Sequence, residues 1–296
     1  MLPNGTGTAI VTPFSPQGDV DHEALAQLVD WQIEEGVDFL VACGSTGEAA
    51  TLTCDERLAV TATVVRSAAG RVPVLAGATD NATARAVDEA QAQAAMGVAG
   101  IMSAAPYYNK PTQAGLEAHF RAIADAIHLP LLLYNVPGRT GVDLRPETVA
   151  RLAEHPRIGG IKEASGGVRR VMDLVAQTPS AFVVLCGDDD IVVPAIASGA
   201  RGLISVASNA LPRTIATIVR HARAGDFVTA RADLLPLLPF IDLLFTEANP
   251  IPVKAALAMQ GRITDTVRLP LLSATAPLRE RMAPFLPMSS RLGVSA

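Results

Sequence analysis

Lys162 is the side chain whose place in the sequence points most directly to chemistry. It follows the short apolar run at residues 158–161, and the chain has only two other lysines, Lys110 and Lys254. Burial favours the neutral form of a lysine, and a neutral amine is the nucleophile that attacks a ketone to form a Schiff base. The alternative is a lysine that ends a strand and simply reaches solvent. The polar residues at the neighbouring strand ends help to decide between the two.

Hydroxyl and phenol side chains follow other apolar runs. The segment G-S-T-G-E at residues 44–48 carries Ser45 and Thr46 between two glycines, which suits a nest for a carboxylate. Taken alone, this segment also fits a tight turn in which Thr46 caps the backbone. The three tyrosines, Tyr107, Tyr108 and Tyr134, all lie at or just after the ends of predicted strands.

Arg139 lies five residues after Tyr134, and its planar guanidinium suits a carboxylate. An amine, proton-carrying hydroxyls and two anion sites are what a Schiff base to a 2-oxo acid requires. Arg139 would then hold a second substrate that also carries a carboxylate. The five histidines fall on predicted helices or at their ends, so none is expected to act as the base.

The acidic run at residues 188–190 is the one segment that resembles a metal site. We interpret it instead as the N-cap of the following helix, where carboxylates complement the helix dipole. No other cluster of Asp, Glu and His suggests a metal, so we expect neither a metal nor a cofactor.

Composition limits the class of protein. The chain has 296 residues, a net charge of −5 and a hydrophobic fraction of 49%. The acidic balance argues against a nucleic-acid partner, and no apolar run approaches the length of a membrane span. The three cysteines fit neither a disulfide framework nor a zinc site. With no secretory signal visible at the N-terminus, a cytoplasmic setting is expected.

Apolar runs and helical patterns alternate eight times. Each predicted strand is a short apolar run without alternation, as in a parallel sheet buried on both faces. The strands are predicted at 8–12, 37–42, 72–76, 99–103, 129–134, 158–162, 182–186 and 202–206. The helices are predicted at 22–35, with Asp21 as N-cap, and at 55–69, 82–96, 112–127, 146–154, 167–177, 190–198 and 211–224.

Eight strand–helix units predict an α/β fold, a (β/α)₈ TIM barrel over residues 1–225. A doubly wound open sheet is the rival, but no G-x-G-x-x-G follows the first strand. Residues 226–296 are predicted to form a C-terminal helical extension, with helices within 226–244 and 252–260. The last stretch, 288–296, is expected to fray.

Six motifs together resemble the dihydrodipicolinate synthase family of the class I aldolase superfamily, which also contains N-acetylneuraminate lyase. They are G-S-T-G-E at 44–48, P-Y-Y-N at 106–109, Y-N-V-P-G-R-T-G at 134–141, G-I-K-E-A at 160–164, G-D-D at 187–189 and N-P-I-P-V-K at 249–254. The resemblance implies a lyase of lysine and diaminopimelate biosynthesis that condenses pyruvate with L-aspartate 4-semialdehyde and needs no cofactor. It also implies a homotetramer built from tight dimers.

The resemblance assigns catalytic roles to four residues. Lys162 corresponds to the lysine that forms the Schiff base with pyruvate, and Tyr134 to the phenol that moves protons. Ser45 belongs to the family's hydroxyl pair. Tyr108 corresponds to the tyrosine that a neighbouring subunit inserts to complete a relay of two tyrosines and a hydroxyl.

Four more residues correspond to substrate-binding positions. Thr46 is the second residue of the hydroxyl pair and lies near the pyruvate carboxylate. Arg139 corresponds to the residue that positions the semialdehyde, and Gly187 and Ile204 line the pyruvate pocket.

The sequence departs from the family pattern in two places. Ser45 stands where these synthases usually have threonine, and serine is common in the lyase branch. A lyase for sialic acid or a 2-keto-3-deoxy sugar acid is therefore the alternative, and a non-catalytic barrel that binds a 2-oxo acid is a remote one. Arg85 stands where lysine-inhibited synthases have an acid, and Cys54 and Arg57 where they have histidines. Because a cation there repels the lysine ammonium, lysine feedback is predicted to be weak or absent.

Overall fold

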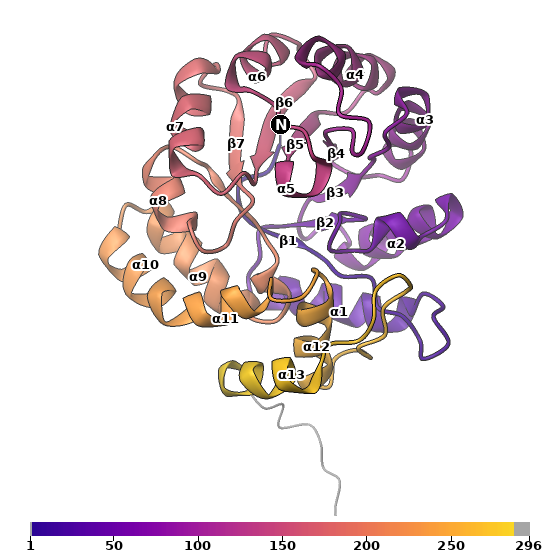
Figure 1. The fold of residues 1–296 in the computed structure, drawn as a ribbon, viewed down its shortest axis with the longest axis vertical. Coiled ribbons are helices and arrows are strands. Elements are labelled where there is room, and N and C mark those ends of the chain that lie inside the picture. The colour runs from indigo at the N-terminus through magenta and orange to yellow at the C-terminus, as the bar shows by residue number, and fades with distance from the viewer. Residues whose placement is uncertain (1, 287–296) are drawn as a thin grey trace, which may run out of the picture.

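Eight short apolar segments form parallel strands that close into a barrel. The computed structural model describes residues 2–286, and the strands pair in chain order from β1 to β8, with β8 returning to β1. This closed ring confirms the predicted barrel over the open sheet (Figure 1). The strands are β1 Gly5–Ala9, β2 Phe39–Ala42, β3 Val74–Gly77, β4 Gly100–Ala104, β5 Leu131–Asn135, β6 Ile158–Glu163, β7 Val183–Cys186 and β8 Gly202–Ser205.

Helices surround the strands on all sides (Figure 1). The helix that follows each strand is found close to where the sequence predicts it. These helices are α1 His22–Glu34, α2 Cys54–Ala68, α3 Thr83–Ala94, α4 Gln113–Ala126, α6 Pro146–Leu152, α7 Val168–Gln177, α8 Val192–Ala197 and α9 Pro212–Arg223. Short helical turns are found at α5 Pro137–Thr140, η1 Ala49–Thr51 and η2 Ala207–Asn209.

Local signals at helix ends account for several of these boundaries. The Asp21 carboxylate accepts a hydrogen bond from the backbone N–H of Ala24, which confirms Asp21 as the N-cap of α1. Thr53 and Glu56 form a reciprocal capping box at the start of α2. After α1 the chain turns at Gly36 with φ of +92°, a conformation that favours glycine.

The first strand lies three residues earlier than predicted. The prediction of 8–12 is wrong because the Gly-Thr repeat at residues 5–8 resembles a loop by propensity alone. In the barrel, glycines in β1 and β8 allow neighbouring strands to approach closely. A Cβ on Gly7 would lie 2.2 Å from the Phe39 ring, and one on Gly202 would lie 2.0 Å from the carbonyl oxygen of Gly5. Tertiary packing therefore overrides strand propensity at this position.

The core has two layers. The inner one fills the barrel and includes Phe39, Leu75, Leu132, Leu185 and Ile204, all fully buried. The larger outer one packs the strands against the surrounding helices. Both faces of each strand are therefore buried, as the unbroken apolar runs predict.

The C-terminal extension packs against the outer core layer. Its helices are α10 Phe227–Leu234, α11 Leu238–Leu243, α12 Ile251–Met259 and α13 Ala276–Met282, with 3₁₀ turns η3 Leu235–Leu237 and η4 Ala283–Phe285. The segment 226–244 contains two α-helices because Pro236 and Pro239 interrupt it. Phe240 and Val253 belong to the same cluster as the barrel's outer core. The stretch 288–296, predicted to fray, lies outside the described residues.

No helix within residues 2–286 is both long enough and apolar enough to span a membrane.

Candidate active site

Lys162 lies on β6 with its side chain inside the barrel, at the carboxyl end of the strands. It is 4% exposed, and its Cα pairs with Tyr134 of β5 on one side and Leu185 of β7 on the other. The Lys162 Nζ lies 4.4 Å from the centroid of the Tyr134 ring. Within residues 2–286 no carboxylate forms an ion pair with this amine, although Lys254 does have such a partner. The sequence-based placement of Lys162 beside Tyr134 is therefore confirmed.

Gly187 leaves the space that the lysine side chain occupies. It follows β7 directly, and a Cβ on this residue would lie 3.0 Å from Lys162 Cε and 2.7 Å from the Cβ of Ala164. Ile204 of β8 is fully buried in the same inner cluster as Tyr134. Both residues therefore lie inside or at the mouth of the barrel that holds Lys162.

The hydroxyl loop, residues 44–48, follows β2 at the same end of the barrel. Ser45 is exposed and Thr46 is buried. Two non-glycine residues with positive φ bracket the loop, Cys43 at 53° and Glu48 at 54°. Left-handed backbone at such residues costs about 1–3 kcal/mol each and persists only where other contacts hold it.

Arg139 extends from α5, the single helical turn that follows β5. Its side chain is exposed, and Nη2 donates to the carbonyl oxygen of Asn249 at 3.3 Å. The side-chain amide of Asn249 donates to Thr46 Oγ1 at 2.9 Å. Asn249 thus connects the two predicted anion-binding residues.

Asn249 is a site residue that the sequence did not predict. It belongs to the N-P-I-P-V-K motif, but it lies 203 residues from Thr46. Only the fold brings the two side chains together.

Tyr108 does not reach Lys162 within one chain. It is 87% exposed on the loop between β4 and α4, with φ of 72°, and its backbone N–H donates to the carbonyl of Thr140. Its predicted partnership with Tyr134 and Ser45 needs a second copy of the chain and stays a prediction.

The acidic run at residues 188–190 does not cap α8, so this prediction is wrong. The N-cap position of α8 is Ile191, without a side-chain hydrogen bond. Asp189 is 1% exposed and instead accepts hydrogen bonds from Ser205 Oγ and from the backbone N–H groups of Val206 and Ala207. It therefore holds the turn after β8.

Asp188, the first residue of the acidic run, is bound differently. Its carboxylate accepts from the backbone N–H of Gly166 at 3.1 Å, and burial raises its pKa to about 6. Within residues 2–286 no group of three or more His, Cys, Asp or Glu side chains is placed to hold a metal ion.

Two cavities lie away from Lys162. One of about 340 Å³ is lined by Cys54, Arg57, Leu58, Asp80, Arg85, Asp88, Glu89 and Ala92. Inside it, Arg57 pairs with Glu89 at 2.5 Å and Arg85 pairs with Asp80 at 2.9 Å. Arg57, Arg85 and Cys54 of this lining are the positions at which the sequence departs from the lysine-inhibited pattern.

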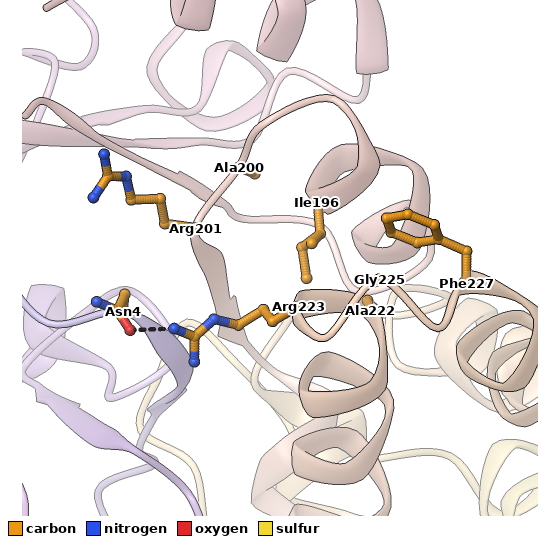
Figure 2. A pocket seen from close by; sticks show the side chains of 8 residues that line it. All are labelled: Asn4, Ile196, Ala200, Arg201, Ala222, Arg223, Gly225 and Phe227. Carbon is orange, nitrogen blue, oxygen red and sulfur yellow. Dashed lines mark hydrogen bonds between the residues drawn. The ribbon is translucent and has the colours of Figure 1, made fainter. Parts of the chain in front are cut away.

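The other cavity, of about 300 Å³, lies at the opposite end of the barrel, where β1 and β8 begin (Figure 2). Arg223 and Arg201 reach into its surroundings, but the first donates to Asn4 Oδ1 and the second to the carbonyl of Ser180. Chemistry in such barrels is located at the carboxyl ends of the strands, so this cavity is separate from the candidate site.

Comparisons with known proteins agree with this geometry. The profile of the "Dihydrodipicolinate synthetase family" matches residues 2–287. A protein of Koribacter versatilis named "4-hydroxy-tetrahydrodipicolinate synthase" is 50% identical, over 99% of this chain and 97% of its own length. One of Geobacter metallireducens with the same name is 48% identical, over 95% and 97%. The crystal structure of the chloride-inhibited dihydrodipicolinate synthase of Acinetobacter baumannii, complexed with pyruvate, is 42% identical, with a TM-score of 0.93 over 95% of this chain and 97% of its own.

Proposed function

The chain belongs to the dihydrodipicolinate synthetase family, and we propose that it condenses pyruvate with L-aspartate 4-semialdehyde through an imine on Lys162. It is an enzyme of the class I aldolase type, and the product is 4-hydroxy-tetrahydrodipicolinate. The observation that carries the assignment of Lys162 is its burial beside Tyr134, with no carboxylate of residues 2–286 in ion-pair contact with its amine. An amine in that setting is available as a nucleophile.

The reaction begins when the neutral Lys162 amine attacks the ketone carbon of pyruvate. The carbinolamine loses water to give the imine, and loss of a methyl proton converts the imine to an enamine. The enamine carbon attacks the aldehyde carbon of the second substrate. The amine of that substrate then adds to the imine carbon, which closes the ring and releases Lys162.

Protons move through hydroxyl groups in this scheme. Tyr134 serves the carbinolamine steps, and the 4.4 Å between its ring centroid and the Lys162 amine supports this role. Ser45 is exposed on the hydroxyl loop and serves as the next carrier. Tyr108 completes the relay from a neighbouring subunit, and its 87% exposure supports this role because the side chain is free to enter another copy.

Two sites hold the substrate carboxylates. Thr46 lies in the hydroxyl loop and binds near the pyruvate carboxylate, with Gly187 and Ile204 lining the remainder of that pocket. Arg139 holds the carboxylate of the semialdehyde. Its link to Asn249 supports this, because residues 2–286 anchor the guanidinium at one nitrogen only.

A homotetramer of tight dimers in the cytoplasm completes the proposal. The exposed Tyr107 and Tyr108 support an interface between copies. The three cysteines are free, which suits a reducing compartment. Analytical ultracentrifugation tests the assembly, and Tyr108→Phe should lower activity only if the relay crosses that interface.

Borohydride reduction in the presence of pyruvate tests the imine directly. Peptide mass spectrometry should find the reduced adduct on Lys162 and not on Lys110, and Lys162→Met should abolish it. Absence of an adduct on Lys162 in the unmodified protein would refute the proposed chemistry. A panel of aldehyde acceptors, including N-acetylmannosamine, then compares the synthase with the lyase alternative.

A further inference from the structure

A buried ion pair connects the C-terminal extension to the hydroxyl loop. Lys254 of α12 and Glu48, the last residue of the loop, lie 2.5 Å apart with side chains 0% and 1% exposed. The second carboxylate oxygen of Glu48 accepts from the backbone N–H of Arg268, and Lys254 also donates to the carbonyl of Thr266. Lys254 Nζ further lies 4.0 Å from the centroid of the Phe14 ring. Both charges are therefore held entirely by the protein.

Glu48 is also where the backbone of the loop is least relaxed. Its φ of 54° is uncommon for a residue with a side chain. Within the loop, the N–H of Glu48 donates to the carbonyl of Ser45, and the N–H of Gly47 donates to that of Gly44. A strained residue keeps its conformation only where its surroundings impose it. Here both oxygens of its carboxylate are anchored by residues of the extension.

The same short segment of the extension holds the loop at a second point. Asn249, two residues before α12, donates to Thr46 Oγ1. Lys254, within α12, binds Glu48. The two contacts lie on either side of Gly47, so they hold the loop in place at two points.

We propose that Lys254 is a positioning residue for pyruvate, acting through Glu48 to hold Ser45 and Thr46 where they meet the Lys162 imine. The inference rests on the proposed function, because it assigns pyruvate to the loop. Lys254 itself does not touch substrate. A residue that only stabilised the contact between the extension and the barrel would affect stability alone. Substitution of Lys254 is expected to change pyruvate affinity as well.

The charge state of Lys254 gives a second way to observe this role. Burial lowers its pKa to about 8, and the charged groups that act on it are Glu48, Arg268 and Asp265. Above that pH the ammonium loses its proton and Glu48 loses its counter-charge. Pyruvate affinity should therefore fall above about pH 8, whereas deprotonation of an amine nucleophile alone would favour imine formation.

The experiment compares Glu48→Gln and Lys254→Met with one control variant at another ion pair between the extension and the barrel. The control is Asp233→Asn on α10, which removes the 3.4 Å ion pair with His221 of α9 and involves neither Arg268 nor the loop. Each variant is characterised by its melting temperature, by the KM for each substrate and kcat, and by the pyruvate dependence of borohydride trapping on Lys162. The double variant Glu48→Gln/Lys254→Met leaves no unpaired buried charge and is used if a single variant does not fold.

We expect Glu48→Gln and Lys254→Met to raise the KM and the trapping midpoint for pyruvate about tenfold, with a smaller change for the semialdehyde. Asp233→Asn should stay within about twofold, since its ion pair is partly exposed. Folded variants with unchanged pyruvate affinity, or an equal effect of the control, would overturn the inference. If neither single variant folds, the double variant decides, and an unchanged pyruvate KM in it overturns the inference. Failure to trap any adduct on Lys162 in the unmodified enzyme would instead refute the proposed function.

Discussion

Gly187→Ala adds one methyl group at a filled position beside the Lys162 side chain. The new Cβ would lie 2.7 Å from the Cβ of Ala164, 3.0 Å from the carbonyl oxygen of Glu163 and 3.0 Å from Cε of Lys162. The first two atoms belong to the rigid end of β6 and the residue after it. The Lys162 chain is the flexible neighbour, so its amine should be displaced.

The size of the effect follows from the cost of overpacking. An extra methylene in a filled site costs about 1–3 kcal/mol. If displacement of the lysine raises the activation free energy of imine formation by about 1–2 kcal/mol, the rate of that step falls about 5- to 30-fold. The remainder should appear as a decrease of about 2–4 °C in melting temperature.

The assay is the rate of borohydride-trapped adduct formation at subsaturating pyruvate, together with kcat/KM in a coupled assay. Gly167→Ala is the matched control, since a Cβ there meets no atom within 4 Å and the residue does not need positive φ. The control should behave like the unmodified enzyme. A folded Gly187→Ala variant that traps pyruvate within about twofold of the normal rate would show that the lysine is not confined as described.

Three further outcomes are expected. Arg139→Ala should lower kcat/KM for the semialdehyde about 10- to 100-fold, because a charge-assisted contact is lost. Trapping of pyruvate on Lys162 should stay normal. Loss of trapping would contradict the separation of the two sites. Millimolar L-lysine should leave steady-state activity nearly unchanged, because Arg57 and Arg85 occupy the positions discussed above, and sub-millimolar inhibition would refute this. Burial lowers the pKa of His119 from 6.5 to about 4, so as pH falls the unfolded state binds this proton before the folded state does. The free energy of unfolding should therefore decrease by up to about 3 kcal/mol between pH 6.5 and 4. Chemical denaturation of His119→Gln should show a smaller decrease.

Local sequence signals were sufficient for the barrel and for the centre of the site. Apolar runs separated by glycine-terminated helices identify the eight strands, and parallel strands bring their carboxyl ends to one face. Lys162 and Tyr134 could therefore be predicted to lie side by side from the sequence alone. The register of β5 and β6 places Tyr134 directly opposite Lys162.

The errors arise where partners are distant in the sequence. Asp189 resembles a helix cap locally, yet its strongest partner, Ser205, lies on the next strand. The true start of β1 depends on Gly7 accommodating the Phe39 ring. Asn249 joins the site from the extension, far from the residues it contacts. Periodicity and residue spacing do not predict contacts between residues that are far apart in the sequence.

The ion pair between Glu48 and Lys254 also sets an order of events during synthesis. The two residues are separated by 206 positions, which at ordinary translation rates of about 5–20 residues per second is a delay of about 10–40 s. Through that interval the growing chain has the loop but lacks its counter-charge and the Asn249 contact. The nascent barrel should therefore bind pyruvate weakly until α12 has been made. A ribosome-stalled chain ending before α12 contains all eight strands and is expected to trap less pyruvate on Lys162 than the full chain does.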